Sequence, residues 1–186
     1  QDQGGVDAII VSHAHMDHIG SLPIISKEYP EARIYTTRMT KDLMKVLLYD
    51  SLKIMKNREG EIPLYAEGDV ISMLNRVFPI NYMVEFSIFE NIKLTFYTAG
   101  HIAGAACIYI TTPEGSLFYS GDFSIFSQKT VEGLKVPKLR PDAAIFESTY
   151  GDRLHSNREV EEEKLIDIIN NCIEKKGKML IPAFAL

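Results

Sequence analysis

Three of the five histidines in this chain lie within six residues, in the segment His13-Ala14-His15-Met16-Asp17-His18. The segment directly follows the apolar run 6–11, which predicts a buried strand, so we expect these side chains in a polar turn at the edge of a sheet. Imidazoles two residues apart can converge on one metal ion. Asp17 and His18 can hold a second ion, because zinc accepts both histidine nitrogen and carboxylate oxygen. The alternative is a solvated polar turn that is rich in histidine, and the embedded aspartate argues against it.

Two further candidates, His101 and Asp122, also follow apolar strands. His101 lies in Gly100-His101-Ile102-Ala103-Gly104, where flanking glycines let the backbone approach closely. Taken alone, it could be a structural histidine, and Asp122 could be an ordinary turn aspartate. Together with the histidine segment, they supply three imidazoles for one metal and a carboxylate able to bridge two. Two ions ~3.5–4 Å apart can hold a bridging hydroxide and stabilise both the attacking and the leaving oxygen of a displacement.

The elements that must position these residues follow a mixed pattern. Apolar periodicity predicts strands at 6–11, 33–36, 83–89, 92–98, 106–111, 117–120 and 143–146, helices at 40–55 and 70–78, and a weaker helix ending near 29–30. Ser156 and Glu159 form a capping box that predicts the start of a helix, which Gly177 can close, and a strand is expected from Met179 onward. This order predicts an α/β layered sandwich rather than a helical bundle.

Composition excludes several classes of protein. A hydrophobic fraction of 46% and a charged fraction of 24% argue against a disordered or fibrous chain. The longest apolar stretch, 179–186, is far shorter than the ~20 residues that cross a bilayer, so we expect no membrane span. The formal charge of −5 does not indicate nucleic-acid binding through bulk positive charge, unless bound cations supply the positive field. Two cysteines without a C-x-x-C motif imply neither a disulfide framework nor a thiolate zinc site.

These motifs together resemble the metallo-β-lactamase superfamily, an αββα sandwich with metals at one edge. The motifs are H-x-H-x-D-H, then G-H-x-x-G, then S-G-D-F. The segment Glu147-Ser148-Thr149-Tyr150-Gly151 is similar to the first signature of the β-CASP nucleases, and the terminal run 181–186 resembles the strand that begins their inserted cap domain. The resemblance implies a partial metallo-β-lactamase domain over 1–150 and the truncated start of a β-CASP domain over 151–186.

The same resemblance implies a role for each site residue. His13, His15 and His101 would hold the first zinc ion. Asp17 and His18 would hold the second, and Asp122 would bridge the two. Asp17 would also accept a hydrogen bond from the metal-bound hydroxide. Glu147 would fix a histidine tautomer or the orientation of a ligand, and its alternative is an exposed glutamate at a strand end. Asp17, Asp122 and Glu147 are thus the expected catalytic residues.

Residues at the end of the signature and just beyond it invite a weaker interpretation. His155 and Arg153 could face the substrate, although a surface loop is favoured, and Tyr150 could stack on a base, although a packed aromatic is favoured. The acidic run 159–164 is expected to form the solvated first turns of a helix.

The activity implied is hydrolysis of phosphodiester bonds in RNA, single-stranded for preference, by a cytoplasmic enzyme with two zinc ions. Three alternatives stay open: a hydrolase of small esters, thioesters or lactams, a DNA-directed β-CASP nuclease, and a non-catalytic scaffold. The scaffold is disfavoured because every ligand expected in this span is present.

The two ends also carry expectations. The chain opens on Gln1 and closes on an apolar run, so we expect a fragment whose family pattern continues before Val6 and beyond Leu186. Two later histidines of the family pattern would lie beyond Leu186, one of them a ligand of the second metal. The 186-residue chain alone is therefore predicted to be catalytically silent, to hold its second metal weakly and to self-associate as a homo-oligomer.

Overall fold

The computed structural model describes residues 4–57 and 62–183. The chain divides into two compact units, Gln1–Glu147 and Ser148–Leu186. Every expected site residue lies in the first unit, and the second contains the helix α5 (Arg158–Glu174). Among the described residues, none of the helices has the length and apolar character needed to cross a membrane.

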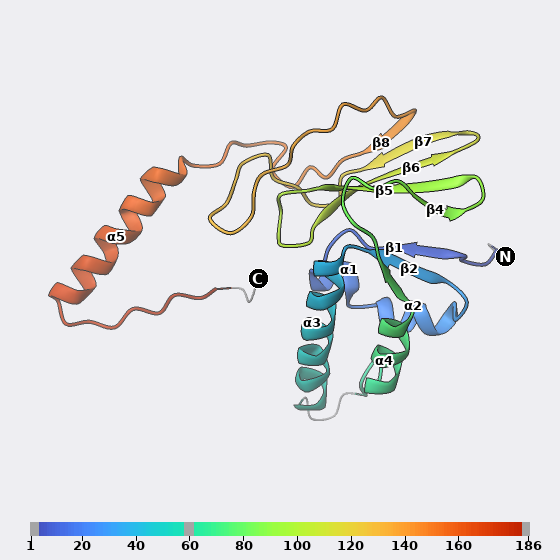
Figure 1. Cartoon of the computed structure of the whole chain (residues 1–186). Coiled ribbons are helices and arrows are strands. Elements are labelled where there is room, and N and C mark those ends of the chain that lie inside the picture. Colours follow the sequence, from blue (N-terminus) through green and yellow to red (C-terminus); the bar gives the residue numbers. More distant parts are fainter. Residues whose placement is uncertain (1–3, 58–61, 184–186) are drawn as a thin grey trace. The chain divides into compact units, whose positions relative to one another are not determined.

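A three-stranded parallel sheet begins the first unit, in the order β1-β2-β3. Its strands are β1 (Ala8–Ile10), β2 (Arg33–Thr36) and β3 (Val77–Pro79). The helices between them are α1 (Met16–Ile19), α2 (Leu22–Glu28), α3 (Arg38–Asn57) and α4 (Glu67–Asn75), and they cover one face of the sheet (Figure 1). Side chains alternate across the sheet, as the pleat requires: Ile34 packs against the helices, whereas Tyr35 faces the second sheet.

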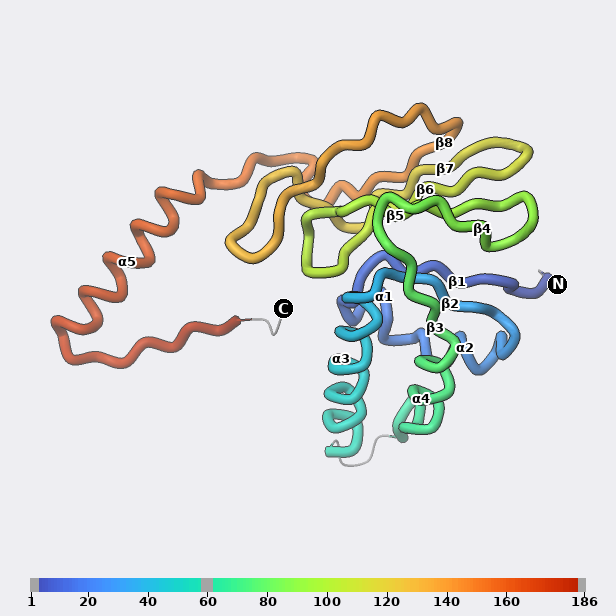
Figure 2. Tube along the Cα trace, in the orientation of Figure 1, coloured from blue at the N-terminus to red at the C-terminus, as the bar shows by residue number. Residues whose placement is uncertain are grey.

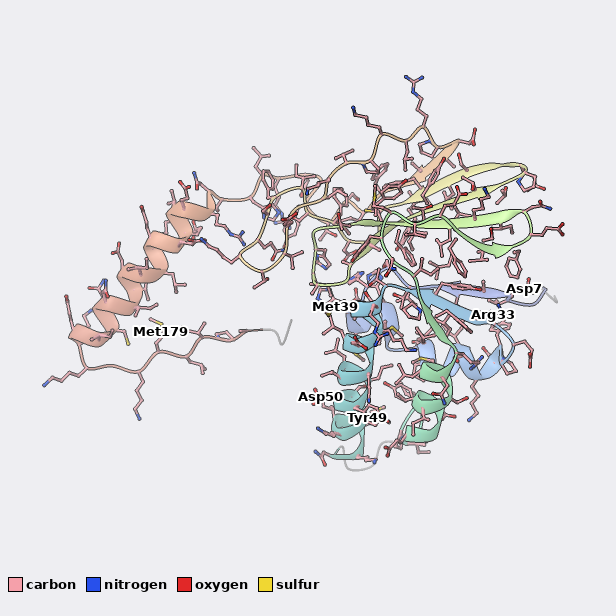
Figure 3. The ribbon with its side chains drawn as sticks, viewed as in Figure 1. Asp7, Arg33, Met39, Tyr49, Asp50 and Met179 are labelled. Atoms are coloured by element: carbon pink, nitrogen blue, oxygen red, sulfur yellow. The ribbon has the colours of Figure 1, made fainter. Side chains whose placement is uncertain are left out.

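The amphipathic pattern predicted at 40–55 is confirmed as the helix α3. Met44, Leu48 and Leu52 recur at four-residue spacing and are buried against the parallel sheet and α4. Tyr49 and Asp50 lie further along the same helix (Figure 3). The helix therefore runs from the level of the strand ends, near Met39, away from the sheet.

A five-stranded sheet forms the next layer, in the order β4-β5-β6-β7-β8. Its strands are β4 (Phe86–Phe89), β5 (Ile92–Thr98), β6 (Ala106–Thr112), β7 (Gly115–Tyr119) and β8 (Ala143–Ile145), antiparallel except for the parallel pair of β7 and β8. Leu94, Phe96 and Ile108 point toward the first sheet and form a shared core with Tyr35. The tube in Figure 2 shows the two sheets face to face.

The layering agrees with the metallo-β-lactamase sandwich over its α, β and β layers. On the outer face of the second sheet, Cys107 and Phe118 pack against Leu134 and Leu139 of the long segment between β7 and β8. In the described part of the first unit, irregular chain therefore takes the place where the sandwich pattern has its second helical layer.

Two element boundaries predicted from the sequence were wrong. The predicted helix 70–78 is the helix α4 followed by the strand β3. Asp69 accepts a hydrogen bond from the Ala66 backbone N–H (2.9 Å), which caps the helix, so the helix begins at Glu67, before the predicted start at residue 70. Val77 then leaves the helical pattern because it pairs with Ile34.

Two predictions in the second unit were also wrong. The cap of α5 is Asn157, whose side chain accepts a hydrogen bond from the Glu159 backbone N–H (2.9 Å), instead of Ser156. Residues 179–183 form no strand, because a strand needs a hydrogen-bonded neighbour and no described segment pairs with them. Leu180 is accordingly 91% exposed. The rest of the predicted strand, 184–186, lies outside the described residues.

Candidate metal centre

The loop after β1 carries the first group of site residues. His13 is fully buried, and its Nδ1 lies 3.1 Å from the Ser12 hydroxyl. Its Nε2 is also buried. Among the described residues, it is the one buried side-chain nitrogen or oxygen atom that has no hydrogen-bond partner. Buried polar atoms are almost always paired. An unpaired imidazole nitrogen that faces other potential ligands is therefore the feature of this site that a metal ion best explains.

A short helix continues from this loop. The segment predicted as a polar turn becomes helical at Met16, where α1 begins. This turn brings the His18 ring to 4.0 Å from the His13 ring, between centroids. Asp17 Oδ2 lies 3.4 Å from His18 Nε2, and the Asp17 side chain is 76% exposed. Asp17 and His18 thus form a second pair on the solvent side of the buried histidine.

His101 comes from the loop between β5 and β6. Gly100 has φ +72°, and a Cβ there would collide with the Ser124 carbonyl oxygen, so only glycine fits. Gln128 Nε2 donates to the His101 carbonyl oxygen (2.8 Å) and holds the loop from its other side. This loop brings His101 Nε2 to 3.0 Å from His15 Nδ1, although the two residues are far apart in the sequence.

Asp122 follows β7 and faces both groups. Its Oδ2 lies 3.7 Å from His13 Nε2 and 3.6 Å from His101 Nε2, while its Oδ1 lies 3.7 Å from His18 Nε2. Gly121 has φ +54°, and a Cβ there would come within 2.9 Å of the Ser12 Cβ. The two oxygens of one carboxylate thus point toward two different sets of potential ligands, which is the geometry of a bridging ligand.

The structure therefore gathers the six predicted ligands at one edge of the two sheets. Four of them place one ligand atom each within 4.8 Å of the others: His13, His15, His101 and Asp122. This donor set of nitrogen and oxygen without thiolate suits zinc, and it also suits other transition metals. A metal ion at this position would satisfy the unpaired His13 nitrogen, so the residues fit the group that the motifs imply.

Burial keeps the innermost histidines neutral. Together with the neighbouring His18, His101 and His15, it lowers the pKa of His13 to about 3. Burial likewise lowers the pKa of His101, together with His15, against the opposing effect of the Asp122 and Glu147 carboxylates. Neutral imidazole is the form that binds a metal ion, so these side chains are in the binding state at neutral pH.

Glu147 anchors the loop that carries Asp122. It lies directly beyond β8, where its backbone N–H donates to the Ser120 hydroxyl (3.0 Å). Its Oε1 accepts a hydrogen bond from the Phe123 backbone N–H (3.3 Å). Glu147 is therefore outside the four-residue cluster, and it contacts the chain on both sides of Asp122. Ser12 and Gln128 support the site in a similar way, and nothing in their sequence context singles them out.

Tyr150, Arg153 and His155 form a separate group in the second unit. The His155 ring lies 4.4 Å from the Tyr150 ring, and the Arg153 guanidinium carbon lies 5.3 Å from the Tyr150 ring centroid. Arg153 also approaches Asp152, with 3.7 Å between Nε and Oδ1. Tyr150 is 53% exposed, so the expectation of a packed aromatic was wrong, while the surface position favoured for His155 agrees with its exposure.

Comparison with known proteins agrees with this geometry. A family model described as the metallo-beta-lactamase superfamily domain matches residues 4–142. Over its full length the chain is 38% identical to an RNase J-like protein of Methanocaldococcus jannaschii, of which it covers 42%. It is 36% identical to the endoribonuclease ysh1 of Schizosaccharomyces pombe (24% covered) and 32% identical to the cleavage and polyadenylation specificity factor subunit 3-I of Arabidopsis thaliana (27% covered).

The chain belongs to the metallo-β-lactamase superfamily. These relatives are members of its β-CASP branch, which confirms the resemblance seen in the motifs. The chain spans less than half the length of each of them.

Proposed function

We propose that this chain is the metal-binding part of a zinc-dependent ribonuclease of the β-CASP type, which hydrolyses phosphodiester bonds in single-stranded RNA. The observation that carries the proposal is the convergence of His13, His15, His101 and Asp122 around an unpaired buried nitrogen. It occurs in a chain that is 36% identical to a protein named as an endoribonuclease.

Six residues would hold two zinc ions. The first set is His13, His15 and His101, the second is Asp17 and His18, and Asp122 belongs to both. When bound, such ions lower the pKa of water and neutralise charge on phosphate oxygens. Dications in the site would also offset the formal charge of −5, which by itself disfavours a polyanionic substrate.

The protein side chains would orient the reacting groups. Asp17 is exposed at the mouth of the site, where its carboxylate can accept a hydrogen bond from the attacking water and so orient it. Glu147 would fix the orientation of the Asp122 carboxylate by accepting a hydrogen bond from the next backbone N–H in the chain, that of Phe123.

The remaining features complete the proposal. Residues 1–150 would form the metallo-β-lactamase domain, and residues 151–186 would begin the β-CASP domain. A cytoplasmic location is part of the same proposal, and the free thiols of Cys107 and Cys172 are compatible with a reducing compartment. Self-association as a homo-oligomer is part of the same proposal, and the exposed apolar side chains of α5, such as Ile166 and Ile168, support it.

The decisive experiment is a cleavage assay of the full-length protein on 5′-labelled RNA, with single-stranded DNA of the same sequence in parallel. We expect RNA cleavage that a chelator abolishes and zinc restores. Cleavage of DNA alone would favour the DNA-directed nuclease. Hydrolysis of a lactam or thioester with RNA left intact would replace the proposed function with the small-molecule hydrolase.

A further inference from the structure

Three buried threonines lie where β2 ends and α3 begins. Thr36, Thr37 and Thr40 are nearly inaccessible to solvent. Each hydroxyl donates to a backbone carbonyl of another segment of the chain. The segments that accept these bonds are the two loops that carry the histidines of the metal centre.

Thr36 holds the start of the first loop. Its Oγ1 donates to the Val11 carbonyl oxygen (2.9 Å), two residues before His13. The Val11 backbone N–H donates to the Tyr35 carbonyl oxygen (2.9 Å), just beyond the last residue pair of β1 and β2. The threonine hydroxyl thus continues the pairing at the point where the chain leaves the sheet, and it sets the position from which His13 projects.

Thr37 and Thr40 hold the second loop. Their hydroxyls lie 2.7 Å and 2.8 Å from the Gly104 carbonyl oxygen, which has two lone pairs and can accept both bonds. Thr37 also caps α3, because its Oγ1 accepts the Thr40 backbone N–H (3.2 Å). Gly104 has φ +85°, and a Cβ there would lie 2.6 Å from the Thr40 nitrogen. The loop that carries His101 therefore rests directly on the first turn of α3.

A tyrosine closes the same network. The Tyr82 hydroxyl donates to the Ala105 carbonyl oxygen (3.0 Å), which follows Gly104 directly in the chain. Adjacent carbonyls of the second loop, those of Gly104 and Ala105, are thus held by side chains from outside that loop. These bonds are made by side-chain hydroxyls and are not part of the backbone pairing between strands, so the two sheets can form without them.

We propose that Thr36, Thr37 and Thr40 are positioning residues for the metal centre. They set the distance between the loop of His13 and the loop of His101, and with it the ligand geometry that the ions meet. The proposal rests on the proposed metal-dependent function. Metal sites lose affinity when ligands are displaced by about half an ångström. A platform that binds both loops through one short segment is suited to prevent such displacement.

The test replaces hydroxyls without changing side-chain shape. The double variant Thr37→Val/Thr40→Val removes both bonds to Gly104 together with the Thr37 cap of α3. Thr37→Ser/Thr40→Ser keeps the hydroxyls and removes only the methyl groups. Thr95→Val is the matched control, because Thr95 is a buried threonine in β5, remote in the pairing from either loop. The measurements on the full-length protein are zinc affinity by chelator competition, the visible absorption of the cobalt-substituted protein, and thermal stability without metal.

We expect the valine pair to weaken zinc binding about tenfold, in the range found when groups that support metal ligands are removed. We also expect it to change the cobalt spectrum, while the serine pair and the Thr95 control keep both. Unchanged zinc affinity and spectrum in the valine pair, with only a loss of metal-free stability, would overturn the proposal. If the valine pair does not fold, Thr36→Val takes its place with the same readouts. Zinc binding is measured without RNA, so a failure of the ribonuclease assay leaves this test unaffected.

Discussion

The carboxylate of Asp122 offers the sharpest perturbation of the proposed site. Asp122→Asn keeps the shape of the side chain and removes its charge. In the structure, Oδ2 faces His13 and His101, and Oδ1 faces His18. A neutral amide cannot serve both sets as a bridging anion. We therefore expect the variant to lose one zinc ion per chain and most of its activity.

The magnitude follows from what the ions contribute. Charge stabilisation by metal ions in a displacement is worth several kcal/mol, and each ~1.4 kcal/mol is a factor of ten in rate. Loss of one ion should thus lower kcat/KM for RNA by roughly 100-fold or more. The assay measures cleavage kinetics and zinc content together. Its control is Asp50→Asn, which makes the same chemical change at an exposed position of α3. An Asp122→Asn enzyme with two zinc ions and kcat/KM within threefold of the parent would refute the bridging role.

Three further predictions concern metal content, pH and the second unit. Elemental analysis of the full-length protein should find close to two zinc ions per chain, and stoichiometric iron without zinc would contradict the zinc assignment. In chelator-treated protein, His13 has a pKa of about 3 when folded and 6.5 when unfolded, so the unfolded state binds a proton first as the pH falls. The free energy of unfolding should therefore be highest above pH 6.5 and decrease as the pH falls toward 3. Urea unfolding should show a loss on the order of 1 kcal/mol per pH unit that His13→Gln removes. His155→Ala should change RNA cleavage less than twofold, and an effect as large as that of Asp122→Ala would show that the site extends into the second unit.

The candidate metal centre was predictable because its signals are local. Three histidines and an aspartate within residues 13–18 favour metal binding over a merely solvated turn. His101 and Asp122 join them through a general rule, that residues just beyond strand ends meet at one edge of a sheet. Their convergence in the structure follows from strand order, which the motifs implied through the resemblance and which the residues alone did not supply.

The misassigned elements show where local patterns fail. Val77 looks helical in the sequence because it continues an apolar spacing, and only its pairing with Ile34 makes it a strand. The apolar run after Met179 has strand-like residues, yet without a neighbouring strand its backbone groups have no partner in a sheet. Thr37 and Thr40 carried no signal at all. A threonine that binds a distant carbonyl looks the same in sequence as one that faces water.

The bond from the Ala106 backbone N–H to the Ser12 carbonyl oxygen (2.9 Å) has a consequence for the order of folding. It joins the start of β6 to the first metal-binding loop, so it forms only after the parallel sheet and the five-stranded sheet have docked. Contacts between segments so distant in the chain are slow to form, because a long loop must close first. A nascent chain that has built only its first sheet holds His13, His15 and His18 without His101 or Asp122. Tight zinc uptake should therefore coincide with sheet docking, and the rate at which the refolding chain captures zinc would time the last step of its folding.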